Sequence, residues 1–180
     1  DNAAITSAIT EADASFAIIL TLQPRVVAGK GASREDQIIA MAADFHKVLP
    51  QPFDIAQIGL TYPTDYYESM NTVLVQECQR YNKLLRAMHS SLVSVQKALK
   101  GLVVLSAELE AMGTAMFNQV VPANWTKVAY PSLKPCTPWF RDLMARLAFV
   151  QDWVDHGVPS NYWISGFFFP QGFLTACLQN

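Results

Sequence analysis

The sequence is short of charged residues. Asp, Glu, Lys and Arg make up 16% of its 180 residues, below the roughly 25% that is typical of soluble domains. The formal net charge is −2, and no stripe of basic side chains stands out. This composition argues against nucleic acid as a partner. So few charges also indicate that part of the surface is covered by protein rather than by water.

Cysteine is scarce as well, and long apolar runs are absent. Cys78, Cys136 and Cys177 lie far apart without a C-x-x-C pair, so we predict reduced thiols in an intracellular protein. No apolar run approaches the ~20 residues that a membrane-spanning helix requires, so we expect no membrane partner. The sequence opens with neither a signal peptide nor Met, and its first residues are therefore expected to be the interior of a longer polypeptide.

Motifs for phosphate and metal binding are also missing. The nearest match to a P-loop is GKGAS at residues 29–33, but the motif G-x-x-x-x-G-K-[ST] needs an earlier glycine that is not there. We interpret residues 29–33 as a solvated turn. The three histidines, His46, His89 and His156, stand singly, and none forms a metal-binding pattern such as H-E-x-x-H.

No group of side chains predicts catalysis. His89 stands next to Ser90 and Ser91, but adjacent residues of a helix point to different faces, so they are not a base and its nucleophile. The acidic residues of two later segments are interpreted as solvated helix charges: Glu108, Glu110, Asp152 and Asp155. We predict no catalytic residue, no cofactor-binding residue and no metal ligand in this protein.

Helical periodicity dominates what the sequence does contain. Apolar residues at helical spacing predict a first helix that ends at Leu22, before Pro24: Ile5, Ile9, Phe16, Ile19 and Leu20. A second helix is predicted to start after Ser33, where S-R-E-D has the form of a capping box, and to close before Pro50. Asp54 is predicted to cap a short helix that runs to residue 60.

A longer helix follows, and its apolar residues repeat in heptads. This heptad seam alternates steps of four and three: Leu74, Cys78, Tyr81, Leu85, Met88, Leu92, Val95, Leu99 and Leu102. Gly101 interrupts the pattern and Ser106 can cap a new helix, so we predict two helices broken near Gly101, with a single kinked helix as the alternative. The short flanking helices and the many aromatic residues favour an intramolecular bundle over a dimeric coiled coil.

The last third of the sequence is rich in proline and aromatic residues. Prolines exclude a long regular element before Thr137 and Pro138, which together predict a helix start, and Gly157 predicts the end of that helix. Residues 161–169, NYWISGFFF, favour β structure and predict a strand. Pro170 is predicted to begin a last helix. The predicted fold class is mainly α: a helical bundle with one long helix, plus a late β-strand.

Four blocks of the sequence resemble the C-terminal region of dynein heavy chains. They are residues 22–25 (LQPR), residues 66–110 (with NTVLVQE and KALKGLVV), residues 121–135 (VPANWTKVAYPSLKP) and residues 163–180 (WISGFFFPQGFLTACLQN). They stand in the family's order and extend over essentially the whole sequence. The stretches KGLVVLS and YPSLKP follow the axonemal members of the family more closely than the cytoplasmic ones.

The resemblance implies one piece of a large ATP-driven microtubule motor built around a ring of six AAA+ modules. Residues 1–160 would be the helical part of the C-terminal domain that follows the sixth module. Residues 161–180 would be the strand and helix that begin an incomplete antiparallel β-barrel, truncated here. ATP and Mg²⁺ belong to the earlier modules of such a heavy chain, and none of their motif residues can be carried over to this segment.

The resemblance also implies partners and a location. The partners are the AAA+ ring and the barrel of the same heavy chain, microtubules through distant parts of it, and the dynein intermediate and light chains. The location is the cytoplasm and cytoskeleton, in the axoneme of a cilium or flagellum. Neither nucleic acid nor a membrane is among these partners, which agrees with what the composition excludes.

Two functions follow from these observations. The first is a structural, non-catalytic segment of the motor, whose long helices resist or transmit the relative rotation of ring modules. The alternative is a stand-alone helical protein-interaction module that grips a partner helix along the heptad seam. In a segment cut from a motor, Phe167, Phe168 and Phe169 are expected to be exposed and adhesive.

Overall fold

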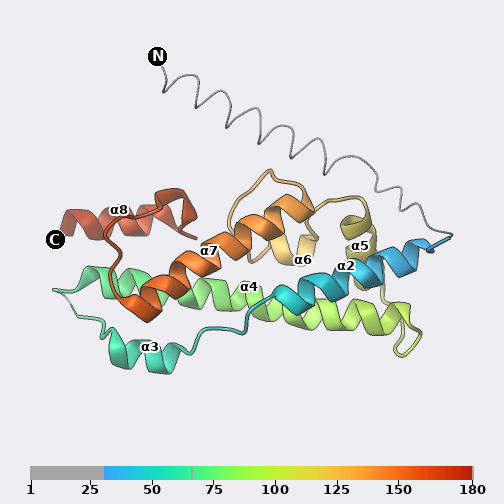
Figure 1. Ribbon diagram of the computed structural model, residues 1–180, viewed down its shortest axis with the longest axis horizontal. Coiled ribbons are helices and arrows are strands. Elements are labelled where there is room, and N and C mark those ends of the chain that lie inside the picture. The colour runs from blue at the N-terminus through green and yellow to red at the C-terminus, as the bar shows by residue number, and fades with distance from the viewer. Residues whose placement is uncertain (1–30, 66, 180) are drawn as a thin grey trace, which may run out of the picture.

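The computed structural model describes residues 31–65 and 67–179 of the protein. The predicted first helix, the LQPR block and residues 29–30 of the predicted turn lie outside these residues. Every regular element within the described residues is a helix (Figure 1): α2 (Arg34–Val48), α3 (Ile55–Thr61), α4 (Ser69–Leu99), α5 (Ala107–Phe117), α6 (Ala123–Thr126), α7 (Cys136–His156), the 3₁₀ helix η1 (Ile164–Gly166) and α8 (Pro170–Gln179).

The long helix α4 is the axis of the fold. Its 31 residues extend about 46 Å at 1.5 Å per residue, and it contacts each of the other α-helices described. The heptad seam is buried by these neighbours, because its side chains between Leu74 and Val95 have no exposed surface, whereas Leu102 at its end is exposed. The seam therefore serves an intramolecular bundle, as predicted, and is not free for a second copy or a partner helix.

The first two described helices begin where the sequence predicts. At the start of α2 the Ser33 hydroxyl accepts the N–H of Asp36 and the Asp36 carboxylate accepts the N–H of Ser33, both at 3.1 Å, which completes a capping box. Asp54 accepts the N–H of Gln57 at the start of α3. α2 packs on α4 and α5, and its Phe45 ring stacks on Phe140 of α7.

The helical path breaks between α4 and α5 at Gly101, as predicted. Gly101 has φ +72°, its N–H donates to the carbonyl of Ala98, and the N–H of Leu102 donates to that of Lys97. This pair of bonds is a Schellman motif, which needs a left-handed residue at the position of Gly101. α5 then starts after Ser106, whose hydroxyl accepts the N–H of Leu109.

The same motif closes α5, but with Gln119 in place of glycine. Gln119 has φ +58°, and the N–H of Val120 donates to the carbonyl of Ala115. The Gln119 side-chain oxygen accepts both the N–H and the hydroxyl of Thr137, at 3.2 and 2.7 Å. α7 therefore begins at Cys136, one residue before the predicted cap, and Thr137 binds the end of α5 instead of capping its own helix. Gly157, with φ +90°, ends α7 as predicted.

The predicted β-strand over residues 161–169 is wrong, and so is the barrel that it was expected to enter. This stretch contains η1 and extended backbone, and no strand occurs in the described residues. The N–H groups of Phe168 and Phe169 donate to the Glu77 carboxylate of α4 instead of to a neighbouring strand. The predicted last helix is confirmed as α8, which packs on α4 and η1. The division of the domain at residue 160 stays a prediction.

Candidate interaction surfaces

The C-terminal segment is held to the bundle by polar groups that we call the clasp: the side chains of Glu77, Tyr81 and Arg146 with the backbone of residues 166–169. Glu77 accepts the N–H of Phe168 and, at 3.0 Å, that of Phe169. The Tyr81 hydroxyl donates to the carbonyl of Gly166 at 2.9 Å, and Arg146 donates to the carbonyl of Phe167 at 3.3 Å. Helices α4 and α7 thus fix one short stretch of backbone from two sides.

A second set of charges holds Arg146 in position. Its guanidinium lies 2.7 Å from the Asp142 carboxylate, which Lys134 also contacts at 2.7 Å. The same guanidinium lies over the Tyr130 ring, 4.0 Å from its centroid, and Tyr130 donates its hydroxyl to Asp142. A planar guanidinium suits this site because it can pair with a carboxylate and stack on an aromatic ring at once.

The two carboxyl groups of this region are perturbed in opposite directions. Burial raises the pKa of Glu77, although the two backbone N–H groups and nearby Arg80 act against the rise. Burial would also raise the pKa of Asp142, but its bonds from Lys134 and Arg146 outweigh that effect and hold the pKa below its usual value. Glu77 therefore carries a desolvated charge, whereas the charge of Asp142 is compensated.

The histidines do not form a site with other ligands. His46 and His89 meet edge to face with ring centroids 5.3 Å apart, a proximity that the sequence did not indicate. His89 Nε2 lies 2.9 Å from the carbonyl of Pro50, and the exposed His156 pairs with Asp152. Among the described residues no group of three or more His, Cys, Asp or Glu side chains could hold a metal ion. That no residue is catalytic, cofactor-binding or metal-binding stays a prediction.

Ser91 and two of the cysteines serve the core. The Ser91 hydroxyl donates to the carbonyl of Ala87 and accepts the indole N–H of Trp125 at 2.8 Å, so it is engaged in packing and not paired with His89. Cys78 and Cys136 are buried free thiols, and burial raises the pKa of each to about 12. Cys177 on α8 is exposed.

Exposed apolar side chains flank α5 at both of its ends, in the segment that precedes the helix and in the last residues of the helix and the turn after it. We call this set the α5 surface: Leu102, Val103, Val104, Leu105, Phe117 and Val120. Val104 is 90% exposed and Leu102 is 71% exposed. Large exposed apolar residues around one helix mark the α5 surface as a candidate contact region.

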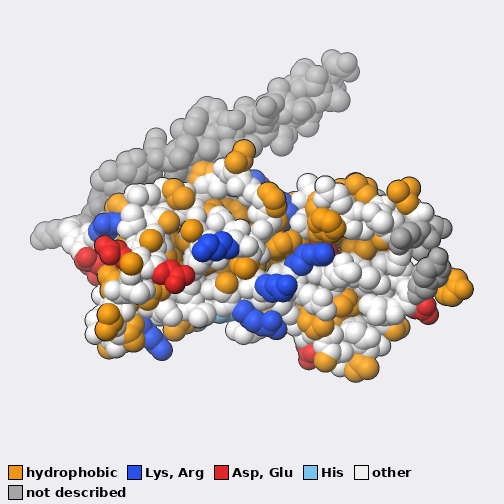
Figure 2. All heavy atoms as spheres, turned by 180° about the vertical axis from the view of Figure 1, so that it is seen from behind, with side chains coloured by type: hydrophobic (Ala, Val, Ile, Leu, Met, Phe, Trp, Pro, Cys, Tyr) orange, Lys and Arg blue, Asp and Glu red, His pale blue; other side chains and the backbone are white. Residues whose placement is uncertain are grey.

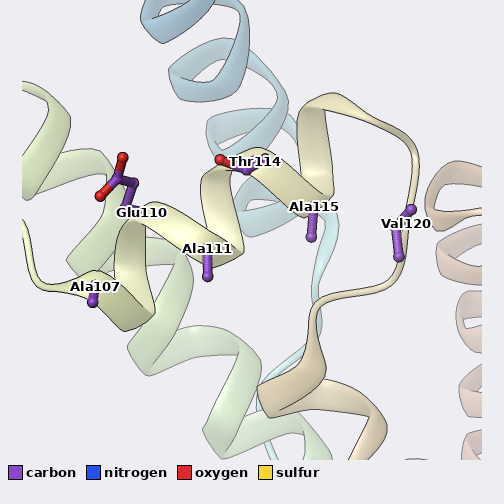
Figure 3. A pocket seen from close by; sticks show the side chains of 6 residues that line it. All are labelled: Ala107, Glu110, Ala111, Thr114, Ala115 and Val120. Carbon is purple, nitrogen blue, oxygen red and sulfur yellow. The ribbon is translucent and has the colours of Figure 1, made fainter.

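A groove runs along α5 beside these residues. Its volume is about 470 Å³, and it is lined by Ala107, Glu110, Ala111, Thr114, Ala115 and Val120. Figure 3 shows the three alanine methyl groups pointing to the same side of α5, with Val120 on the segment that follows the helix. The floor of the groove is therefore built from small side chains.

The aromatic end of the protein is less exposed than predicted. Phe167 is 1% exposed and stacks on Phe173 of α8, with ring centroids 4.5 Å apart, and Phe168 packs edge to face on Tyr81. Only Phe169 of the three is exposed, and Arg80 lies over its ring. The expected adhesive edge is therefore wrong for Phe167 and Phe168, which pack within the bundle.

The surface opposite the view of Figure 1 is charged across its middle. Figure 2 shows Lys and Arg side chains gathered there and Asp and Glu side chains toward the two ends. On α4, the exposed residues Lys83, Arg86 and Lys97 make no ion pair with the described residues. None of the helices described has the length and apolar character that crossing a membrane would require.

Comparisons with known proteins agree with the resemblance seen in the sequence. The family model for the C-terminal domain of dynein heavy chains matches residues 9–180. The sequence is 51% identical over 180 residues to dynein axonemal heavy chain 1 of Rattus norvegicus and 43% identical to dynein axonemal heavy chain 3 of Homo sapiens. It is 42% identical over 181 residues to the dynein-1-beta heavy chain of the flagellar inner arm I1 complex of Chlamydomonas reinhardtii.

These alignments include nearly all of this protein but little of the relatives. They extend over 99% to 100% of its residues and over 4% of each of the three relatives. The 180 residues thus correspond to a small part of much longer proteins.

Proposed function

The protein belongs to the family formed by the C-terminal domains of dynein heavy chains, and we propose that it is a structural and regulatory segment of an ATP-driven axonemal microtubule motor, without catalysis of its own. The observation that carries the proposal is the identity of 42% to 51%, along essentially the full sequence, to axonemal and flagellar heavy chains. The described polar groups support a structural role, since the buried side chains of Glu77 and Tyr81 on α4 bind the backbone of residues 166–169.

In this proposal the segment packs on the AAA+ ring of its own heavy chain and contributes to ciliary or flagellar motility. Its further partners are the intermediate and light chains of the motor complex, and microtubules are reached by distant parts of the heavy chain. Its location is the axoneme. The names of the relatives, which are axonemal and flagellar heavy chains, support this part of the proposal.

The proposal assigns ATP and Mg²⁺ to earlier modules of the heavy chain and no cofactor to this segment. The measurement is a titration of the 180-residue protein with ATP and Mg²⁺, followed by calorimetry. We expect no saturable binding. Saturable binding of ATP would contradict the non-catalytic assignment and would favour a small helical enzyme.

Membership in a longer motor is tested by the mass of the native polypeptide. An antibody against residues 66–110 is used on a denaturing gel of source tissue. We expect a very large band that follows the ciliary fraction. A band near 20.0 kDa, the mass of these 180 residues alone, would contradict the motor segment and support a free-standing module.

The mechanical role rests on α4 and α7, the two long helices that the clasp joins through residues 166–169. Elements that are rigid and packed can pass a rotation of one ring module to the next. The test is Tyr81→Phe in the intact heavy chain, because this change removes only the hydroxyl bonded to Gly166. Lys83→Gln, on the exposed face of the same helix, is the control.

We expect Tyr81→Phe to lower the microtubule gliding velocity per ATP hydrolysed and Lys83→Gln to leave it unchanged. Hydrogen exchange at residues 166–169 reports whether the clasp has loosened. Faster exchange there, with ATPase and gliding both unchanged, would contradict the mechanical role.

A further inference from the structure

We propose that the α5 surface and its groove are the docking site for the apolar stripe of residues 5–20 of this same molecule. The α5 surface consists of large apolar side chains in water, which is an unfavourable arrangement unless something covers them. The inference is independent of the proposed function, because it concerns only how one part of the protein covers another.

The polypeptide enters the described structure at the edge of the groove. Arg34, the first residue of α2, donates a hydrogen bond of 2.7 Å to the hydroxyl of Thr114, which lines the groove. Its guanidinium also lies 5.3 Å from the centroid of the Phe117 ring. Figure 1 shows the start of α2 at the same end of the molecule as α5 and the segment that joins α4 to α5. Whatever precedes Arg34 therefore begins beside the uncovered surface.

The preceding sequence has the chemistry that this surface lacks. Residues 5–20 carry large apolar side chains at helical spacing: Ile5, Ile9, Phe16, Ile19 and Leu20. Residues of this size fit between the small residues of α5, as the ridge of one helix fits the groove of another. The family match also includes residues 9–30, so this sequence belongs to the same domain as the helices that carry the groove.

The connection is long enough for the contact. Residues 21–33 separate the stripe from α2, and 13 residues span at most about 45 Å. α5 has 11 residues, which extend about 16 Å. Residues 5–20 can therefore reach the whole groove without any movement of α2.

A photo-crosslinking experiment in the complete 180-residue protein tests the proposal. One sample carries p-benzoylphenylalanine in place of Val120, on the α5 surface, and a matched sample carries it in place of Leu60, which is exposed on α3. After irradiation at low protein concentration, the crosslinked peptides are identified by mass spectrometry. We expect the probe at position 120 to capture residues 5–20 of the same molecule and the probe at position 60 not to do so.

Other captures would overturn the proposal. A product joining two molecules, which runs as a dimer on a denaturing gel, would make a second copy the occupant. Equal capture of residues 5–20 from positions 120 and 60 would mean that the contact is not specific to the groove. Capture of no peptide from residues 5–20 at position 120 would also contradict it.

Two charge substitutions in the docking segment sharpen the result. Ile9→Asp places a carboxylate in the apolar stripe, whereas Ser7→Asp places one on the opposite side of the same predicted helix. Both positions lie outside the described helices. We expect Ile9→Asp to lower the crosslink yield at least about tenfold and Ser7→Asp to leave it within about twofold, where tenfold corresponds to about 1.4 kcal/mol. Equal effects of the two changes would contradict docking through the stripe.

Discussion

The two ends of α4 differ in the contacts that surround them. At its N-terminal end, α4 holds residues 166–169 through the buried side chains of the clasp, and the Phe173 ring of α8 stacks on Phe167 in the same region. At its C-terminal end, a glycine turn leads into the α5 surface, where large apolar residues face water. The first end pairs the buried polar groups of the clasp within the described residues, although Phe169 and Leu178 near it are exposed. Among the same residues, the second end has no such polar contacts at its exposed apolar side chains.

The two ends differ in the kind of side chain that they place in the interior and at the surface. The clasp buries polar groups and gives each a partner, which is the condition for burying them without a large loss of stability. The α5 surface has well-satisfied backbone, since both Schellman motifs are complete, but its side chains remain exposed. Substitutions within the clasp should therefore affect the stability of the fold, whereas substitutions of the exposed side chains of the α5 surface should affect its contacts.

The largest effect is expected from Glu77→Ala in the clasp. The change leaves the N–H groups of Phe168 and Phe169 without their acceptor, and each unsatisfied buried group costs about 1–3 kcal/mol. We expect the free energy of unfolding to fall by about 3 kcal/mol, measured by urea denaturation. The neighbouring Gln76→Ala, at an exposed position, is the control and should change little; equal losses would show that the clasp contributes nothing specific.

A smaller loss is expected at the junction of α5 and α7. Gln119→Ala removes two hydrogen bonds to Thr137 and keeps a strained backbone at φ +58°, so we expect a loss of about 2 kcal/mol. Gln119→Gly loses the same bonds but relieves about 1 kcal/mol of strain. Chemical denaturation of both variants should rank Gly above Ala; the reverse order would mean that the left-handed backbone costs nothing here.

Gly101→Ala tests the turn that leads to the α5 surface. A methyl group at Gly101 would meet no atom within 4 Å, so only the φ of +72° opposes it, at about 1 kcal/mol. Gly59→Ala is the matched control, because Gly59 lies in α3, is equally open and has no positive φ. In thermal unfolding Gly101→Ala should lower the melting temperature and Gly59→Ala should raise it; a change of the same sign in both would contradict the role of φ.

The effect of pH on the free energy of unfolding through Glu77 should be smaller than the effects of these substitutions. Burial and the two N–H donors act on the pKa of Glu77 in opposite directions. A raised pKa means that folding favours the protonated carboxyl. The Glu77 contribution is therefore fully present below its ordinary pKa of 4.5 and is lost as the pH rises through the raised value. The stability of the wild type relative to Glu77→Gln should grow from pH 7 toward pH values below 4.5 in urea titrations; a shrinking difference would show that the N–H bonds outweigh burial.

The smallest effect is expected from Leu178→Ser on α8. Leu178 is exposed although it belongs to the end of the molecule that the clasp holds, so we expect the free energy of unfolding to change by less than about 0.5 kcal/mol. Calorimetric unfolding measures it. A loss as large as that of Glu77→Ala would mean that exposed apolar residues, not the clasp, stabilise this end.

The sequence predicted the elements that depend on local signals. The capping box at Ser33, the glycine turn at Gly101 and the heptad seam of α4 all act between residues a few positions apart. The burial of the heptad seam could also be predicted, because an apolar stripe on a helix is stable only where neighbouring helices pack against it.

The failures came from contacts between distant residues. The aromatic content of residues 161–169 favoured a strand, but Phe168 finds its acceptor on Glu77, which lies 91 residues earlier in the sequence. Gln119 and Thr137 meet in the same way, 18 residues apart. One signal was present but unused: Glu77 stands beside Cys78 of the heptad seam, and an acid next to a buried seam needs a partner. The residues around Glu77 in the sequence, however, do not indicate which backbone N–H groups its carboxylate binds.

The position of Cys78 has a consequence for measuring motion. Cys78 follows Glu77 directly on α4, and its thiol is buried with a pKa raised to about 12, while Cys177 on α8 is exposed. Alkylating reagents must reach a thiol to modify it, so the exposed Cys177 is modified first and Cys78 only when its surroundings open. The rate at which Cys78 is modified therefore reports how often the α4 core beside the clasp opens, and no cysteine has to be introduced for the measurement.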